Sequence, residues 1–135
     1  MLPPVCSPVR IVEAADASRL YVSARGENAI LEFDPHRLEK DPEHSLIRSF
    51  VSGGTAPVGV QLFMSDRFLA VANSNRFAEG NGNVAIFNVA SNSEEKPQIL
   101  SAGGFPRNIS LSADGSTLYL TNYKSRSLQV LKLSH

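Results

Sequence analysis

The feature that most constrains the fold of this chain is an internal repeat with a period of 49 residues. Pro8, Pro57 and Pro106 stand 49 residues apart, and the residues that follow them match in chemistry. Three, twelve and fourteen places after these prolines, the chain has apolar residues in every copy: Ile11, Leu20 and Val22; Val60, Leu69 and Val71; Ile109, Leu118 and Leu120. A fixed period of this length is typical of repeat architectures, which stack one supersecondary unit several times.

Each repeat is predicted to begin with a β-hairpin. A turn that contains Asp16, Asp66 or Asp114 separates the two apolar clusters of each copy, and Asp114-Gly115 is a strong hairpin signal. Third strands are expected at 29–33, 84–89 and 128–133, and weaker fourth strands at 46–50 and 98–100. The third copy reaches the end of the sequence before a fourth strand. Between His36 and His44, Pro35 and Pro42 limit any helix to one or two turns.

Four short antiparallel strands per repeat of about 49 residues describe the blade of a β-propeller. We therefore predict an all-β fold, a β-propeller segment of about three blades that forms an incomplete ring. The predicted blades are 7–53, 54–102 and 103–135, and the last blade lacks its fourth strand. A β-sandwich also contains many short strands, but it would give no reason for the repeat.

The incomplete ring predicts a need for association. Propellers close with four to eight blades, so an arc of three leaves the flanks of its end blades uncovered. We expect these flanks to be covered by remaining propeller blades or by self-association of the chain. A six-blade ring made from two chains is one such outcome.

Composition excludes several classes of function. The 13 basic and 13 acidic residues give zero net charge, which argues against nucleic acid and membrane surfaces as partners. Cys6 is the only cysteine, so no intramolecular disulfide can form, and we expect neither a metal site nor a cofactor. The sequence has no membrane-length apolar run and no signal peptide at its start, which predicts a cytoplasmic location unless a further N-terminal region directs secretion.

The usual catalytic motifs are absent. His36, His44 and His135 fall in a predicted outer connection or at the terminus, away from the inner strands, and no Gly-x-Ser-x-Gly motif is present. Gly80-Asn81-Gly82 is interpreted as a hairpin tip, because it lacks the third glycine of a dinucleotide fingerprint. The pairs Gly53-Gly54 and Gly103-Gly104 are expected to supply positive φ angles where one blade crosses to the next.

One stretch carries a family resemblance. Residues 103–122, from Gly103-Gly104-Phe105-Pro106 to Tyr119-Leu120-Thr121-Asn122, resemble the YVTN-type propeller repeat, and 20–23 and 69–73 look like degenerate copies. The Pro106-Arg107 pair and the strand 128–133 are similar to lactonase-type seven-bladed propellers, which include 6-phosphogluconolactonase and the fungal carboxymuconate cyclases. The resemblance covers about residues 5–133 and corresponds to the C-terminal portion of such a ring.

The resemblance implies that arginines near the channel mouth bind the carboxylate or phosphate of a substrate. Arg107 matches the Pro-Arg pair directly, Asn108 follows it, and Arg10 is offset by one residue. Glu13 is the only acidic residue on a predicted inner strand. The ordinary alternative for both arginines is an ion pair with an acidic neighbour or a hydrogen bond to a loop carbonyl.

Two departures from the family pattern argue against catalysis. Asn108 stands where the family often has a histidine, and the other copies have neither histidine nor glutamate there. We therefore predict a lactonase-like segment that is catalytically silent as the isolated chain, with a site for a small carboxylated or phosphorylated lactone. In a complete ring, any activity would be of the lactonase or muconate-lactonizing type. The alternative is a non-catalytic propeller scaffold for protein-protein interaction.

Overall fold

The computed structural model describes residues 6–90 and 96–133, which form three antiparallel β-sheets. The first sheet contains β1 (Pro8–Glu13), β2 (Leu20–Ala24), β3 (Ala29–Phe33) and β4 (Leu46–Val51). The second contains β5 (Pro57–Phe63), β6 (Phe68–Asn73), β7 (Asn83–Asn88) and β8 (Gln98–Ser101). The third contains β9 (Pro106–Leu111), β10 (Thr117–Asn122) and β11 (Ser127–Lys132).

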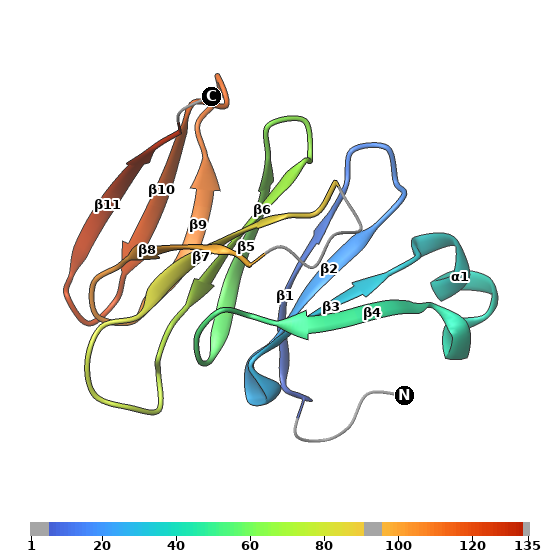
Figure 1. The fold of residues 1–135 in the computed structure, drawn as a ribbon, viewed down its shortest axis with the longest axis horizontal. Coiled ribbons are helices and arrows are strands. Elements are labelled where there is room, and N and C mark those ends of the chain that lie inside the picture. The colour runs from blue at the N-terminus through green and yellow to red at the C-terminus, as the bar shows by residue number, and fades with distance from the viewer. Residues whose placement is uncertain (1–5, 91–95, 134–135) are drawn as a thin grey trace.

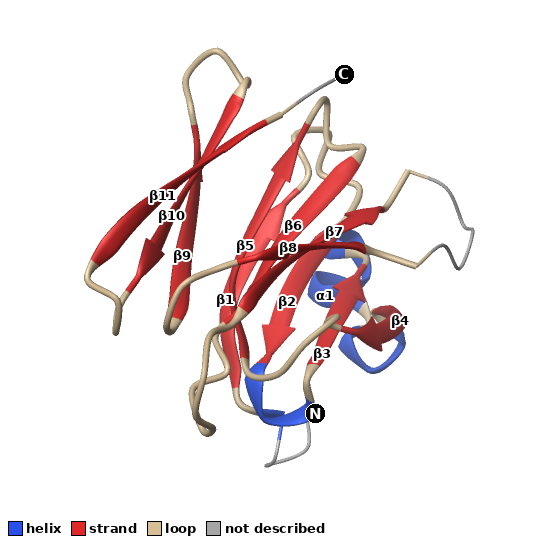
Figure 2. Cartoon of the chain, turned by 60° about the vertical axis from the view of Figure 1, so that its left-hand side comes forward, coloured by secondary structure: helices blue, strands red, loops and turns tan. Residues whose placement is uncertain are grey.

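The strands of each sheet follow one another in chain order, and the three sheets fan out from their first strands (Figures 1 and 2). β5 packs against β1 on one side and β9 on the other, so the first strands are the innermost ones. None of the three sheets closes on itself. This arrangement confirms the predicted all-β propeller segment, because two packed sheets would have made a sandwich instead.

The three prolines occupy equivalent places, as the repeat predicted. Pro8, Pro57 and Pro106 are the first residues of β1, β5 and β9. The apolar residues three and fourteen places after each proline pair directly across the first two strands: Ile11 with Val22, Val60 with Val71, and Ile109 with Leu120. The repeat in the sequence is therefore a repeat in strand register.

The core lies between neighbouring sheets. The middle sheet is covered on both sides, and β6 shows this most clearly, because five of its six residues are buried. Leu69 and Val71 face the first sheet and pack with its residues Tyr21 and Ile30. Phe87 of β7, in the same sheet as β6, belongs to this cluster too. Ala70 and Ala72 face the third sheet, and the cluster there is Phe63, Ala70, Ala72, Val84, Ala102, Ile109, Leu118 and Leu120. The alternation of a strand's side chains divides β6 between two interfaces.

Helix is confined to short segments between strands. α1 (Pro35–Lys40) begins after Asp34, whose side chain accepts a hydrogen bond of 3.0 Å from the backbone of His36. The 3₁₀ segment η3 (Pro42–His44) follows it, and η2 (Arg25–Glu27) joins β2 to β3. The two helical turns in the outer connection were expected from the positions of Pro35 and Pro42. Within the described ranges, no helix has the length and hydropathy needed to cross a bilayer.

The loops form two faces at opposite ends of the strands. The turns between the first and second strands carry Asp16, Asp66 and Asp114, as predicted, and lie along the upper edge in Figure 1. We call this the hairpin face. The loops at the other end follow the second strand of each sheet (25–28, 74–82 and 123–126) or lead from one sheet into the next (52–56 and 102–105). We call this end the crossover face.

Candidate functional site

The crossover face has the same unusual backbone at each entrance to an inner strand. Ser7, Ala56 and Phe105, which precede the three repeat prolines, have φ angles of 48°, 53° and 59°. Positive φ is uncommon outside glycine, and for a bulky residue such as Phe105 it is an outlier that often marks a functional region. The glycines were expected to fill this role. Only Gly53 among the two glycine pairs has a positive φ.

Gly54 and Gly103 are needed for close approach instead. A Cβ at Gly54 would lie 2.7 Å from the Cβ of Asn73, and one at Gly103 would lie 2.9 Å from the Cγ of Asn122. Both asparagines bond to the crossover backbone: Asn73 donates to the carbonyl of Ser52 at 2.8 Å, and Asn122 accepts from the N–H of Gly103 at 3.0 Å. The glycines therefore let the asparagines reach the loops.

A β-bulge follows the proline in every inner strand. Each first strand has one more residue than its partner between the proline pair and the next apolar pair. The bulge contains Arg10 in β1 and Arg107 and Asn108 in β9. A hydroxyl on the second strand bonds to it in both sheets: the N–H of Arg10 donates to Ser23 Oγ and that of Asn108 to Thr121 Oγ1, each at 3.1 Å. Bulges re-aim side chains and occur often beside active sites.

Arg107 stacks on two aromatic rings. Its Cζ atom lies 5.9 Å from the ring centroid of Phe105 and 5.8 Å from that of Tyr123, and the two rings lie 5.5 Å apart. The side chain is exposed and makes no ion pair with any described residue. At these distances the guanidinium makes cation–π contacts with both rings, and it forms no side-chain hydrogen bond within the described residues.

The stacking continues across the crossover face into the other two sheets. The Cζ atom of Arg76 lies 5.8 Å from the ring centroid of Phe105 and 5.5 Å from that of Phe77. The Cζ atom of Arg25 lies 5.6 Å from the same Phe77 ring centroid. The series Arg25, Phe77, Arg76, Phe105, Arg107 and Tyr123 thus joins all three sheets. The sequence analysis did not predict this series. The adjacent Arg76 and Phe77, in loop 74–82 between β6 and β7, were the available signal.

Arg10 and Glu13 lie elsewhere. Arg10 is exposed on β1 and lines a mainly apolar cavity of about 340 Å³ with Phe33 and Leu38, on the flank of the first sheet that faces away from the second. β5 separates β1 from β9, so the structure does not bring Arg10 beside Arg107. Glu13 is exposed at the hairpin end of β1, where it pairs with Leu20. Asn108 is exposed on the outer flank of the third sheet.

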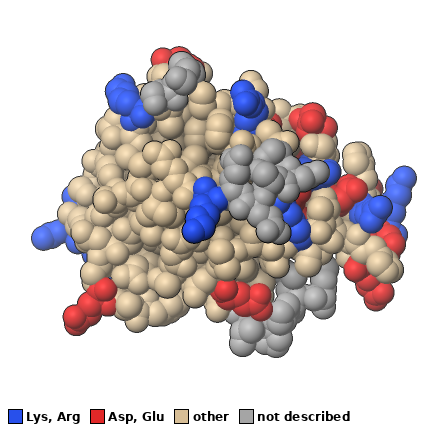
Figure 3. Space-filling model, viewed as in Figure 1, with Lys and Arg blue, Asp and Glu red and all other residues tan. Residues whose placement is uncertain are grey.

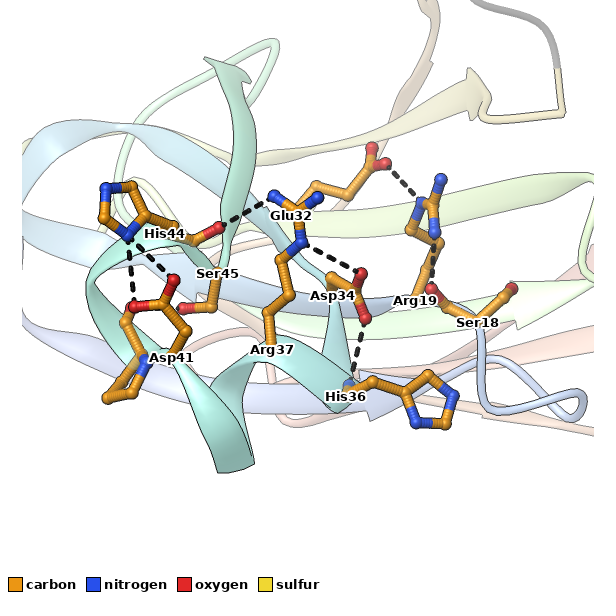
Figure 4. Close-up of polar contacts among 10 residues, drawn as sticks. Ser18, Arg19, Glu32, Asp34, His36, Arg37, Asp41, His44 and Ser45 are labelled. Atoms are coloured by element: carbon orange, nitrogen blue, oxygen red, sulfur yellow. Dashed lines mark hydrogen bonds and ion pairs between the residues drawn. The ribbon is translucent and has the colours of Figure 1, made fainter.

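The histidines lie away from the inner strands, as the sequence indicated. His36 in α1 and His44 in η3 are exposed, and His44 Nδ1 lies 2.9 Å from a carboxylate oxygen of Asp41 (Figure 4). His135 is outside the described residues. Between 6 and 133, omitting 91–95, no three His, Cys, Asp or Glu side chains gather in a way that could hold a metal ion.

A cluster of charged side chains near the hairpin face was not predicted by the sequence analysis. Glu32 in β3 is buried, and its carboxylate accepts hydrogen bonds from Arg48 Nε at 2.7 Å and Arg19 Nε at 3.1 Å; Figure 4 shows the contact with Arg19. Burial, followed by the charge of Glu32, raises the pKa of Tyr21 to about 12. In the sequence, Glu32 is the one charged residue within the apolar strand Ala29–Phe33, and this position could have indicated a buried ion pair. Since both arginines neutralise Glu32, we assign this cluster a structural role.

Charged side chains of both signs are scattered over the face drawn in Figure 3, without a large area of one sign. On the crossover face, the cationic side chains that lie over aromatic rings are Arg25, Arg76 and Arg107. This pattern suits recognition of one anionic group better than the tracking of a charged polymer.

Comparison with solved structures identifies the fold. A candidate 6-phosphogluconolactonase from Bacteroides fragilis matches with a TM-score of 0.80 and 17% identity over 98% of this chain and 36% of that one. A periplasmic gluconolactonase from Pseudomonas aeruginosa matches with 0.71 and 19% over 98% and 37%. A β-propeller domain from Myceliophteria thermophila matches with 0.51 and 17% over 92% and 40%. The fold is that of a lactonase-type β-propeller.

The chain spans about two-fifths of the length of the structures that it resembles. Comparisons with protein-family models and with curated proteins found no match. The three structures described above are 17–19% identical to this chain, so the likeness concerns the arrangement of strands. Any activity of this chain has to be argued from its side chains.

Proposed function

We propose that this chain is a lactonase-like propeller segment that binds a small carboxylated or phosphorylated lactone, or the acid derived from it, at Arg107 on the crossover face. The observation that carries the proposal is the position of Arg107 over the rings of Phe105 and Tyr123, without an ion pair among the described residues. A guanidinium held in one plane offers two parallel N–H groups to two oxygens of an anion.

We further propose that the isolated chain is catalytically silent. Hydrolysis of a lactone needs a general base or an activated nucleophile within hydrogen-bond reach of the bound ester. The side chains that the sequence analysis weighed as bases lie elsewhere: His36 and His44 are on the outer connection of the first sheet, and Glu13 is at the far end of β1. The anion site would thus bind without converting its ligand.

The binding test compares Arg107→Lys with the unaltered chain. Lysine keeps the positive charge and loses the planar fork, and charged hydrogen bonds are worth about 1.5–3 kcal/mol. Titration with 6-phosphogluconate, followed by calorimetry, should show at least about tenfold weaker binding for the variant, with a nearly unchanged Tm. Equal affinity for both proteins would contradict the site, and a large drop in Tm would indicate a structural role for Arg107.

The silence test measures release of acid from 6-phosphogluconolactone in a pH-stat. With the isolated chain, the rate should equal the spontaneous rate in buffer. A rate above that in buffer would contradict the proposal that the isolated chain is catalytically silent. If Arg107→Lys abolished that rate, the proposed binding site at Arg107 would still stand. The alternative function, a scaffold for protein-protein interaction, draws support from the exposed apolar flanks of the end sheets, and it predicts no binding to any lactone or sugar acid.

A further inference from the structure

A pocket with both polar and apolar lining residues lies on the crossover face, between the first and second sheets. It has a volume of about 310 Å³, which is at the lower end of the range for small-molecule sites. The side chains that line it come from three loops: Arg25, Asn28, Thr55, Asn75 and Phe77. Its position on the far side of Arg76 from Phe105 separates it from Arg107.

Arg25 carries a buried polar atom that has no hydrogen-bond partner among the described residues. This atom is Nε, and the guanidinium makes no ion pair with those residues. The ring of Phe77, 5.6 Å from Cζ, holds the side chain in place. Leaving a charged donor buried and unpaired is costly, so such a group calls for an acceptor.

Several other polar side-chain atoms of the pocket form hydrogen bonds within the protein. Thr55 Oγ1 donates to Asn75 Oδ1 at 2.8 Å, and Asn75 Nδ2 donates to the carbonyl of Glu79 at 3.1 Å. Asn28 Oδ1 accepts from the N–H of Ala56 at 2.8 Å. Within the described residues, Asn28 Nδ2 donates to no other group, so an incoming ligand would meet Arg25 and this amide.

Acidic side chains do not line the pocket. Glu27 follows Arg25 by two residues and Glu79 lies in the loop that carries Phe77, but both are exposed and neither forms an ion pair with Arg25. A cationic donor without a partner, with no carboxylate among the lining residues, favours an oxygen anion. The volume restricts the anion to a small molecule.

We propose that this pocket is an oxyanion site, in which the side edge of the Arg25 guanidinium and the amide of Asn28 bind the carboxylate or phosphate of a small metabolite. The site does not depend on Arg107. Binding would give Arg25 Nε the acceptor that it lacks and would tie loop 25–28 of the first sheet to loops 52–56 and 74–82 of the second.

The test is an NMR titration of the full chain that follows the Nε–H signal of Arg25. Two probes, inorganic phosphate and succinate, distinguish phosphate from carboxylate as the bound group. We expect a saturable shift of this signal in the unaltered chain with one of them. Arg25→Lys has no such signal, so its affinity is measured from the backbone amide signals of loops 25–28 and 52–56, and it should be at least about tenfold weaker. Asn28→Ala should weaken binding by a smaller factor, with melting curves recorded for both variants to verify folding.

Two controls make the test decisive. Arg126→Lys alters another exposed arginine of the crossover face that lies outside the pocket, and it should leave the affinity unchanged. Arg107→Lys should also leave it unchanged, so failure of the lactone site would not mimic failure of this one. A shift that does not saturate, or an equal loss of affinity in Arg25→Lys and Arg126→Lys, would show only diffuse attraction and would overturn the proposal.

Discussion

Asp114 organises the turn between β9 and β10 through its carboxylate. One oxygen accepts from the Ser112 hydroxyl at 2.7 Å, the Ser116 hydroxyl at 2.7 Å and the Ser116 N–H at 3.1 Å. These hydrogen bonds, chiefly those from the side chains of Ser116 and Ser112, lower the pKa of Asp114 to about 2. A single carboxylate thus adds to the backbone hydrogen bonds of this turn, which join Gly115 N–H to the carbonyl of Ser112 and Ser112 N–H to the carbonyl of Thr117.

The lowered pKa predicts an acid-dependent stability. An unfolded aspartate has a pKa of about 3.9, so the folded state favours the charged form, and its contribution is complete above about pH 4 and lost as the pH falls toward 2. Asp114→Asn cannot titrate. The difference in Tm between the two proteins should be constant from pH 7 to 5 and should shrink between about pH 4 and 2.

Melting curves recorded by circular dichroism across this pH series measure the effect. Glu39→Gln, on the exposed surface of α1, is the charge-matched control and should give no such convergence. A Tm difference for Asp114→Asn that stays constant down to pH 2 would contradict the assigned role of the carboxylate.

At the scale of elements, the bulge of each inner strand connects neighbouring blades. Ser23 in β2 accepts from the N–H of Arg10 and donates to the carbonyl of Val58 in β5 at 2.8 Å. Between β5 and β9, the contact is a close backbone approach: a Cβ at Gly59 would lie 2.7 Å from the carbonyl oxygen of Arg107. Gly59 therefore allows β5 to support the bulge that carries Arg107.

Gly59→Ala should destabilise the chain and displace Arg107. A methyl group at this distance from backbone cannot be accommodated without moving one strand, and overpacking of this kind costs about 1–3 kcal/mol. Urea unfolding measures the loss of stability, and titration with 6-phosphogluconate should show weakened binding. Ser110→Ala, at an exposed position of β9, is the control expected to change neither. Full stability in Gly59→Ala would show that β5 and β9 do not rely on this contact.

At the scale of the whole molecule, the two end sheets each expose an apolar flank. On the first sheet, Ile11 is 62% exposed beside the apolar cavity that Phe33 and Leu38 line. On the third sheet, Leu128 is 75% exposed, and Val130 and Tyr119 lie on the same face because they pair across β10 and β11. These faces are equivalent to those that pack together inside the molecule.

We therefore predict that the isolated chain self-associates through these flanks. Leu128→Lys with Val130→Lys should shift the species observed by sedimentation velocity toward the monomer, because two buried charges would oppose contact at the flank. Ile47→Lys with Ile99→Lys, on the outer strands β4 and β8, makes the matched control. A monodisperse monomer of the unaltered chain, or an effect confined to the control, would show that the flanks do not drive association.

The amino-acid sequence by itself determined the strands and their grouping into repeats. The third strands at 29–33, 84–89 and 128–133 and the fourth strands at 46–50 and 98–100 were predicted to within one residue of their observed bounds. Apolar alternation and turn chemistry act between residues close in the chain, so they can be read without knowledge of tertiary contacts. The equivalence of the three prolines followed from the repeat for the same reason.

Only the tertiary structure decided which side chains meet on the crossover face. Arg10 and Arg107 were both expected near the channel mouth, yet β5 lies between their strands. Arg25, from the loop after β2, lies near Phe77 of the second sheet. The positive φ angles of Ala56 and Phe105 could not be foreseen, because the residue before a proline ordinarily avoids them. Contacts between residues far apart in the chain hold both features in place: Arg25 lies over Phe77, Asn28 accepts from the N–H of Ala56, and Tyr123 donates to the carbonyl of Phe105. Such contacts have no signature in local sequence.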